Sequence, residues 1–267
     1  MSATDGRPLL NGKLLGVSEF DEGVAVNQQS IEAYDLPQRV ASYDTDMELM
    51  HPNRSKMVRA ALQILPFVGT APLSALDLGV GTGYFSQQFL ACFPNSRVLA
   101  IDGARLMVDL AKARLGDAAS RVDFRIDDFR NLNRAAADLP AFDVVFSSYA
   151  LHHLNGADKQ SVVGQALDLL KPGGWFVNAD LVVAESPEIE ARIQEVRVSG
   201  IVERACGKDE RFRDASTTRR YLDELEANEH DQPLAMSADL EILRRAGLRS
   251  ASALWLEHRE AVCVGRK

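Results

Sequence analysis

Short apolar runs alternate with helix-like segments through the middle of the chain. Five apolar runs of four or five residues cover residues 75–78, 98–101, 122–125, 142–146 and 175–179. Segments with apolar residues at helical spacing lie between them, over residues 84–92, 104–115 and 159–170. This alternation predicts a parallel sheet with helices on both faces. Such sheets bind ligands beyond the carboxyl ends of their strands, so we expect a site there.

The segments that flank this region have a different pattern. Residues 21–70 carry two helical patterns, at residues 28–34 and 54–65, separated by a stretch that contains proline. Residues 181–235 are charged and helical in pattern, and they show no strand pattern. We therefore expect helical additions before and after the main part of the sheet.

The last thirty residues return to the pattern of the sheet. Residues 238–246 predict a helix, and Gly247 is expected to end it. Two further strands are expected over residues 250–255 and 261–264. The turn between them is short, so they should pair antiparallel.

Composition narrows the classes of partner. The 267 residues include 30 Lys and Arg against 38 Asp and Glu, a net charge of −8, and no segment is basic. A nucleic-acid or anionic-membrane partner is therefore not expected. Three widely spaced cysteines argue against a zinc site or a disulfide framework. No signal-like or membrane-length apolar run is present, so we expect a soluble, cytoplasmic protein.

A glycine-rich loop follows the first apolar run, with the sequence Asp-Leu-Gly-Val-Gly-Thr-Gly-Tyr over residues 77–84. Gly79, Gly81 and Gly83 allow a tight turn and a close approach of the backbone to a ligand. Asp77 would repel a diphosphate but suits a ligand that carries an ammonium group. Asp102 ends the second run, where a carboxylate favours a bidentate bond to ribose hydroxyls.

These features, in this order, resemble the class I S-adenosylmethionine-dependent methyltransferases. Further matches are Asp-Asp-Phe at residues 127–129, the stretch over residues 147–154 and the Leu-Lys-Pro-Gly-Gly-Trp turn at residues 170–175. The resemblance covers residues 74–180 well and residues 238–267 more loosely. It implies S-adenosylmethionine as cofactor and S-adenosylhomocysteine as product. In the family an acid after the third strand contacts the adenine amino group, which here is Asp128 or Asp127. The cofactor-binding residues implied are Asp77, Gly79, Gly81, Gly83, Asp102, Gly103, Asp127, Asp128, Phe129 and Ser147.

The resemblance also implies an overall architecture. We expect an α/β fold with a Rossmann-like, doubly wound, seven-stranded sheet, mostly parallel with an antiparallel C-terminal hairpin strand, and a helical cap. Residues 1–70 should form an arm and helical lid, with residues 1–20 as the arm. Residues 71–180 and 236–267 should form the core. Residues 181–235 should form an inserted cap over the acceptor site.

Candidates for the acceptor side come from the stretch after the fourth strand and from the additions. Tyr149 and one of the pair His152 and His153 are catalytic candidates, with the histidine as a general base near working pH. Adjacent residues point apart, so only one histidine should face the site, and a histidine that merely walls the pocket is the alternative. No metal is expected, because methyl transfer from a sulfonium needs none. Further pocket candidates are Tyr34, Tyr43, His51, Arg54 and His230.

The sequence thus favours a methyltransferase that acts on a small-molecule acceptor, as in specialised metabolism, by alignment of the reactants and exclusion of water. We expect a monomer or homodimer. One alternative is an enzyme of carboxy-S-adenosylmethionine synthesis or tRNA wobble-uridine modification, which would need Arg197, Arg204 or Arg213 for an added carboxylate. Another alternative is a module that binds S-adenosylmethionine without catalysis. An NAD-dependent oxidoreductase is disfavoured by the glycine spacing.

Overall fold

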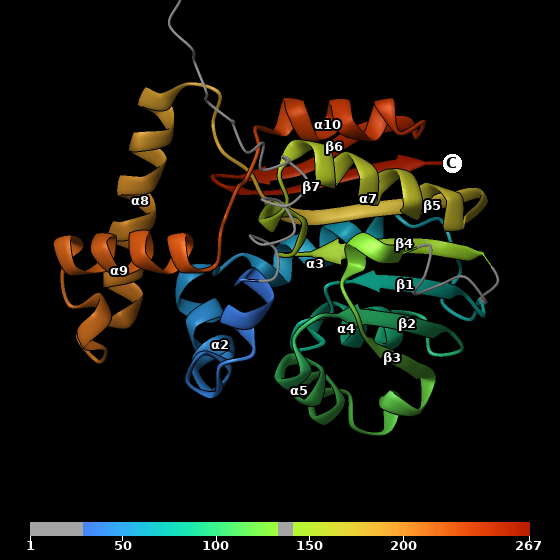
Figure 1. Ribbon diagram of the computed structural model, residues 1–267, viewed down its shortest axis with the longest axis horizontal. Helices are drawn as coiled ribbons and strands as arrows, with labels where there is room; N and C mark the ends of the chain where they lie inside the picture. Colours follow the sequence, from blue (N-terminus) through green and yellow to red (C-terminus); the bar gives the residue numbers. More distant parts are fainter. Residues whose placement is uncertain (1–28, 133–140) are drawn as a thin grey trace, which may run out of the picture.

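A computed structural model describes residues 29–132 and 141–267, so the arm expected over residues 1–20 lies outside the described residues. One seven-stranded sheet has the order β3-β2-β1-β4-β5-β7-β6. Among these strands β7 runs antiparallel to both of its neighbours, as the sequence predicts for the terminal hairpin. The predicted fold class is confirmed (Figure 1). The strands are β1 (Ser74–Leu78), β2 (Arg97–Asp102), β3 (Val122–Ile126), β4 (Phe142–Ser148), β5 (Leu170–Leu181), β6 (Arg249–Glu257) and β7 (Glu260–Arg266).

Helices cover both faces of the sheet, and each face has its own apolar core. One core packs α3 (Arg54–Gln63), α4 (Tyr84–Cys92) and α5 (Arg105–Leu115) against the sheet. The other core packs α7 (Gly156–Leu169) and α10 (Met236–Arg245) against the opposite face, on the upper side of the sheet in Figure 1. Each core is built from alternate strand residues, so the sheet is buried on both sides and its polar groups collect at the strand ends.

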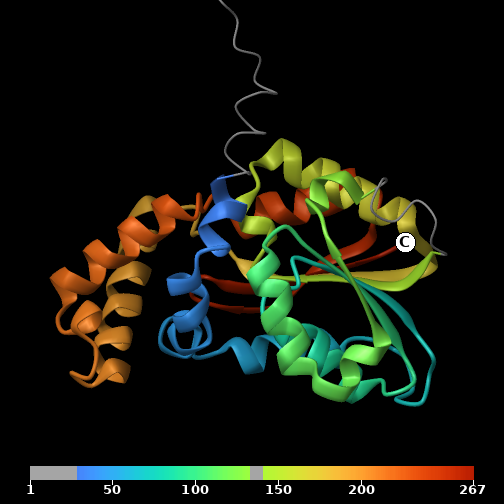
Figure 2. The same cartoon turned by 60° about the horizontal axis from the view of Figure 1, so that its bottom comes forward.

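The additions form a separate layer beyond the ends of the strands. The N-terminal part contains a short helix over residues 29–34 and α2 (Pro37–Met50). The insert contains α8 (Pro187–Ala205) and α9 (Ala215–Asn228), which stand to one side of the sheet (Figure 2). A small third core joins α2 to this pair. Its buried residues are Met50, Val198, Ile201, Ala205, Phe212 and Leu222.

Helix α2 corrects the sequence interpretation, which placed a proline-bearing break between the two N-terminal helical patterns. Pro37 occupies the first turn of α2, where its missing N–H costs nothing and its fixed φ suits a helix. The proline therefore starts a helix instead of interrupting one. Within the described residues, none of the helices is long and apolar enough to cross a membrane.

Candidate active site

The three glycines of the loop after β1 serve different purposes. Gly79 has φ 74°, and a Cβ there would lie 2.4 Å from the Cβ of Ala150. Gly83 has φ 78°, and a Cβ there would lie 3.0 Å from the backbone of Ala111 on α5. Gly81 has φ 51°, and nothing lies within 4 Å of its Cβ position, because it borders an open cavity. Gly79 and Gly83 thus fix the turn, and Gly81 leaves space for a ligand.

Two buried carboxylates stand at the ends of β1 and β2. Asp77 accepts a hydrogen bond from Ser86 Oγ at 2.6 Å, and burial raises the pKa of Asp77 to about 7. Asp102 accepts hydrogen bonds from the N–H groups of Gly81 at 2.7 Å and Ala104 at 2.9 Å. Burial also raises the pKa of Asp102. A cationic group next to Asp77 and hydroxyl donors next to Asp102 would relieve the cost of these buried charges.

A cavity of about 780 Å³, open mouth included, lies over these strand ends. Its place, beyond the carboxyl ends of β1 and β2, is where open α/β sheets bind ligands. Seven of the predicted cofactor-binding residues line it: Asp77, Gly79, Gly81, Asp102, Gly103, Asp128 and Phe129.

The other three predicted cofactor residues lie beside the cavity. Gly83 packs α4 against α5, as described above. Ser147 donates its hydroxyl to the carbonyl of Leu78 at 2.8 Å and so ties β4 to β1. Asp127 accepts the N–H of Asp128 at 2.8 Å. Of the two acids that the sequence left open, Asp128 is the one that faces the cavity, and it also caps the short helix that follows it.

Residues of the N-terminal helices form one wall of the cofactor cavity. Tyr34, Tyr43 and Arg54 line it, as expected for a lid. A Cβ on Gly103 would lie 2.6 Å from the side chain of Ile31, so the lid packs directly on the backbone after β2. Asp44 of α2 is paired with Arg114 of α5. Lid and core are therefore in close contact around the mouth of the cavity.

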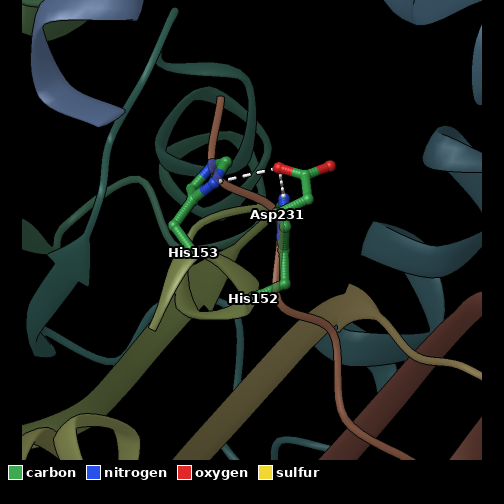
Figure 3. Close-up of side chains that lie close together, drawn as sticks. All are labelled: His152, His153 and Asp231. Atoms are coloured by element: carbon green, nitrogen blue, oxygen red, sulfur yellow. Dashed lines mark ion pairs between the residues drawn. The ribbon is translucent and has the colours of Figure 1, made fainter. Parts of the chain in front are cut away.

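The two adjacent histidines do not point apart as the sequence analysis expected. They lie in a short 3-10 helix over residues 151–153, where successive side chains are about 120° apart. Their ring centroids are 4.0 Å apart, and both rings approach Asp231 (Figure 3). His153 lines the cofactor cavity, and its Nδ1 lies 3.1 Å from Asp231 Oδ1. His152 is turned away from that cavity.

His152 forms the centre of a buried charge network. Its Nδ1 lies 2.6 Å from Asp180 Oδ1, and its Nε2 lies 3.4 Å from Asp231 Oδ1. These two carboxylates outweigh burial and raise the pKa of His152 to about 10. The ring is then an imidazolium at neutral pH, with no lone pair to take a proton from a substrate or to bind a metal. One ring nitrogen of each histidine and a carboxylate oxygen of Asp231 lie within 4.8 Å of one another. In this arrangement the positive charge of His152 is paired with the carboxylates of Asp180 and Asp231.

A second cavity, here called the inner chamber, adjoins the first. It has a volume of about 390 Å³ and lies among α2, α8, α9 and the end of β4. Tyr34, Tyr43 and Tyr149 line both cavities, so these three rings mark the junction. The remaining walls are mainly apolar or ionic side chains: Arg39, Met47, Met50, His51, His152, Leu181, Arg197, Leu225, Glu226, Glu229 and Asp231.

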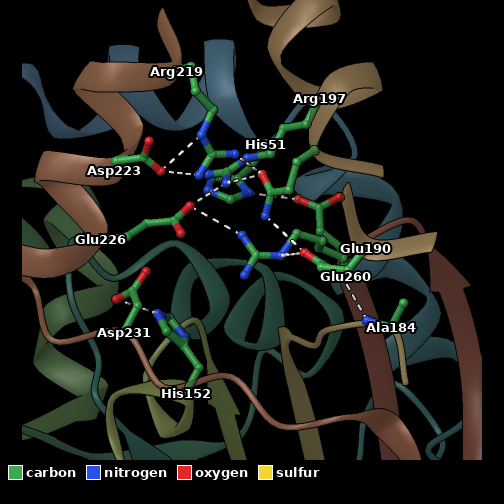
Figure 4. A network of polar contacts seen from close by, with 12 residues as sticks. His51, His152, Ala184, Glu190, Arg197, Arg219, Asp223, Glu226, Asp231 and Glu260 are labelled. Carbon is green, nitrogen blue, oxygen red and sulfur yellow. Dashed lines mark hydrogen bonds and ion pairs between the residues drawn. The ribbon is translucent and has the colours of Figure 1, made fainter. Parts of the chain in front are cut away.

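The ionic walls of the inner chamber are paired with one another. Tyr34 donates its hydroxyl to Glu229 at 2.8 Å, and Arg39 donates to the same carboxylate at 2.5 Å. Arg197 is paired with Glu226, which also binds Arg259 at 3.1 Å (Figure 4). Ion pairs around the chamber thus link the lid, the insert and the turn that joins β6 to β7.

Tyr149 has an unusual backbone and a buried hydroxyl. Its φ is 50°, a strained value for a residue other than glycine, and such strain is concentrated at functional sites. Its hydroxyl donates to Glu260 Oε1 at 2.6 Å, and His51 Nδ1 lies 3.0 Å from the same oxygen. Burial and Glu260 raise the pKa of Tyr149 well above its ordinary value, so the phenol remains neutral.

The sequence analysis named His230 as a pocket candidate, but His230 lines none of the cavities described here. Four acids with buried side chains were not among its candidates: Asp180, Glu229, Asp231 and Glu260. His230 has φ 57° in the turn after α9, and its two neighbours face inward instead. Of the three arginines considered for an added carboxylate, Arg197 borders the inner chamber and is already paired with Glu226. Arg204 borders another cavity, and Arg213 borders neither.

Comparison with known proteins gives a consistent set of matches. Residues 75–174 match the family model of a methyltransferase domain. An uncharacterized methyltransferase of Anoxybacillus flavithermus is 33% identical over 130 residues, which is 49% of this chain and 57% of that protein. An O-methyltransferase family protein from Burkholderia thailandensis superposes with TM-score 0.63 at 18% identity, over 88% of this chain and 61% of that one.

A second solved structure, of PigF with SAH, superposes with TM-score 0.60 at 16% identity, over 90% of this chain and 62% of that one. The chain therefore spans about three fifths of the length of each of these three proteins. At such identities the two structures establish the fold.

Proposed function

We propose that the chain, whose residues 75–174 match a methyltransferase domain, is a class I S-adenosylmethionine-dependent methyltransferase with S-adenosylmethionine as its cofactor, and that it methylates a small molecule held in the inner chamber. The cofactor supplies a methyl group on a positively charged sulfur, which leaves as a neutral thioether. Asp77 suits the amino group of such a cofactor, and Asp102 suits its ribose hydroxyls. Asp128 and Phe129 line the same cavity, and we assign the adenine ring to them.

One observation carries the proposal: the cofactor cavity and the inner chamber share a wall formed by Tyr34, Tyr43 and Tyr149. A methyl donor in one cavity and an acceptor in the other would face each other across this junction. In-line transfer requires alignment and exclusion of water, and alignment alone contributes about 7–11 kcal/mol to such reactions. Tyr43 and Tyr149 are each 8% exposed, so these two rings are shielded from bulk water.

The chamber favours a small acceptor over a macromolecule. It lies among α2, α8 and α9, and its volume of about 390 Å³, open parts included, leaves no room for a macromolecule. Its charged walls are paired internally, and its free surface is provided by tyrosine, methionine and leucine side chains. The net charge of −8 argues against a polyanion such as RNA.

Release of S-adenosylhomocysteine tests the proposal. Purified protein with S-adenosylmethionine is incubated with phenols, amines, indoles, keto acids and bulk tRNA, and the product is measured by chromatography. We expect turnover with a small molecule and none with tRNA. Turnover with tRNA alone would contradict the proposal, and tight cofactor binding without any turnover would favour a binding module. A thermal-shift measurement adds a control, because stabilisation by NAD alone would contradict the cofactor assignment.

A further inference from the structure

A third cavity continues from the inner chamber toward the surface. This outer cavity, with a volume of about 910 Å³, lies between α8 and the turn that joins β6 to β7. It shares Met50, His51, Leu181 and Arg197 with the inner chamber. The three cavities therefore follow one another, with Tyr149 at the first junction and His51 at the second.

His51 is held rigidly at the second junction. It ends α2, and its backbone N–H bonds to the carbonyl of Met47 at 2.9 Å. The residue is 8% exposed, and the centroid of its ring lies 4.9 Å from that of Tyr149. Its Nδ1 is 3.0 Å from Glu260 Oε1, whereas its Nε2 has no hydrogen bond among the described residues.

Glu260 fixes the state of this ring. It is 6% exposed and accepts from both His51 and Tyr149, and these contacts hold the pKa of Glu260 below its ordinary value. An ionised carboxylate cannot donate, so His51 Nδ1 carries the proton of this bond. The lone pair of the neutral ring is then on Nε2. Burial lowers the pKa of His51, so that the ring is neutral at pH 7.

We propose that His51, oriented by Glu260, is the general base of the reaction, and that the acceptor is a phenol. The inference rests on the proposed function. The phenolic hydroxyl gives its proton to His51 Nε2 as its oxygen bonds to the methyl carbon. The carbon–sulfur bond breaks, its electron pair stays on sulfur, and the sulfonium becomes a neutral thioether. The imidazolium is balanced by Glu260 and returns its proton to water through the outer cavity.

The base and the aromatic walls together select the phenol. A thiolate is nucleophilic without a base, and an aliphatic alcohol is too weak an acid for imidazole. A phenol and an alkylammonium both have a pKa of about 10 and lie within reach of a histidine, so the walls of the chamber decide between them. Tyr34, Tyr43 and Tyr149 offer ring faces and edges against which an aromatic acceptor packs.

The first test uses the free full-length protein and needs no acceptor. The ¹⁵N shifts of the His51 ring are followed from pH 5 to pH 9, and His51→Asn assigns the signals. We expect a neutral ring at pH 7 with its proton on Nδ1, and loss of that preference in Glu260→Gln. A proton on Nε2, or an imidazolium at pH 7, would overturn the assignment.

The second test compares His51→Asn with His258→Asn as its matched control. His258 borders the outer cavity and has φ 56°, which asparagine tolerates. With phenol acceptors at pH 7 we expect kcat to fall about 10²- to 10⁴-fold in His51→Asn and to remain near wild type in the control. The Kd for S-adenosylmethionine should stay within threefold. Equal values of kcat in the two variants would contradict the assignment of His51 as the general base.

The acidity of the phenol distinguishes a base from a residue with a structural role, because only the loss of a base should depend on the pKa of the acceptor. Nitrophenols are already ionised near neutral pH, so the loss in His51→Asn should shrink for them. The rate of the variant with ordinary phenols should rise about tenfold per pH unit as the acceptor ionises. The charged and titratable groups around His51 are Tyr149, His152, Arg197, Arg204, Glu226, Glu257, Arg259 and Glu260, and among them Glu260, Arg197 and His152 act on the pKa of its ring.

The outcomes separate the two proposals. Wild-type turnover with amines or thiols but with no phenol would contradict the acceptor class and leave the methyltransferase function standing. Absence of turnover with every small molecule would contradict the proposed function itself. In that case the ring tautomer still decides whether His51 and Glu260 are arranged as a base.

Discussion

The cofactor cavity and the inner chamber are neighbours, but they are built in opposite ways. The cofactor cavity is formed at the ends of adjacent parallel strands, by a glycine loop and by acids within a few residues of each strand end. The inner chamber is formed by side chains from elements far apart in the sequence. Arg39 meets Glu229 across 190 positions, and His51 meets Glu260 across 209. Local sequence thus specifies the first region, whereas only tertiary packing creates the second.

The largest effect is expected from a substitution that blocks the cofactor cavity and leaves the inner chamber unchanged. Gly81→Leu places a side chain in the space left for the ligand, and we expect affinity for S-adenosylmethionine to fall at least about 1,000-fold, or about 4 kcal/mol. Gly116→Leu is the control, because Gly116 has φ 52° and equally open surroundings. Isothermal titration calorimetry should show wild-type affinity in the control. Equal loss in both variants would mean that strain, and not blockage, is responsible.

A loss of stability of comparable size is expected when a buried ion pair of the inner chamber is broken. Glu229→Ala leaves the buried guanidinium of Arg39 without its nearest carboxylate, which should lower the free energy of unfolding by about 3 kcal/mol. Glu224→Ala on the exposed side of α9 should change it by less than about 0.5 kcal/mol. Urea denaturation measures both. If Glu229→Ala abolished cofactor affinity in the folded protein, the two regions would not be separable as described.

Asp102→Ala should have a smaller effect, which is confined to the affinity for the cofactor. Loss of a charge-assisted hydrogen bond costs about 1.5–3 kcal/mol, and we expect the affinity for S-adenosylmethionine to fall accordingly. The exposed Asp109→Ala on α5 serves as the matched control in the same titration. Unchanged affinity in Asp102→Ala would show that this carboxylate does not bind the ribose.

The smallest effect concerns pH. In the free protein burial raises the pKa of Asp77 to about 7, and a cationic ligand should lower it again. Binding then releases a proton, so affinity is full above pH 7 and declines below it. We expect binding about tenfold weaker at pH 6 than at pH 8, the equivalent of about one pKa unit. Asp77→Asn should lose this dependence, and a wild-type affinity that is constant from pH 6 to pH 8 would contradict the assignment.

The contrast between the regions also explains what the sequence could predict. The alternation of strands and helices, the glycine loop and the acids Asp77 and Asp102 follow from patterns that are local and periodic, and the resemblance that these patterns support adds the role suggested for Asp128. Helix α2 was missed because a proline marks a helix start and a helix break equally well. The chamber was only partly foreseen, because no spacing connects His51 or Tyr149 to Glu260. His152 was considered as a base, but two distant acids, Asp180 and Asp231, make it a cation.

A structure with S-adenosylhomocysteine bound would decide whether the two cavities hold donor and acceptor side by side. We expect the ribose on Asp102, the amino group near Asp77 and the sulfur at the junction of Tyr34, Tyr43 and Tyr149, facing the inner chamber. A ligand whose sulfur faces away from these three rings, or one bound outside the glycine-loop cavity, would contradict it.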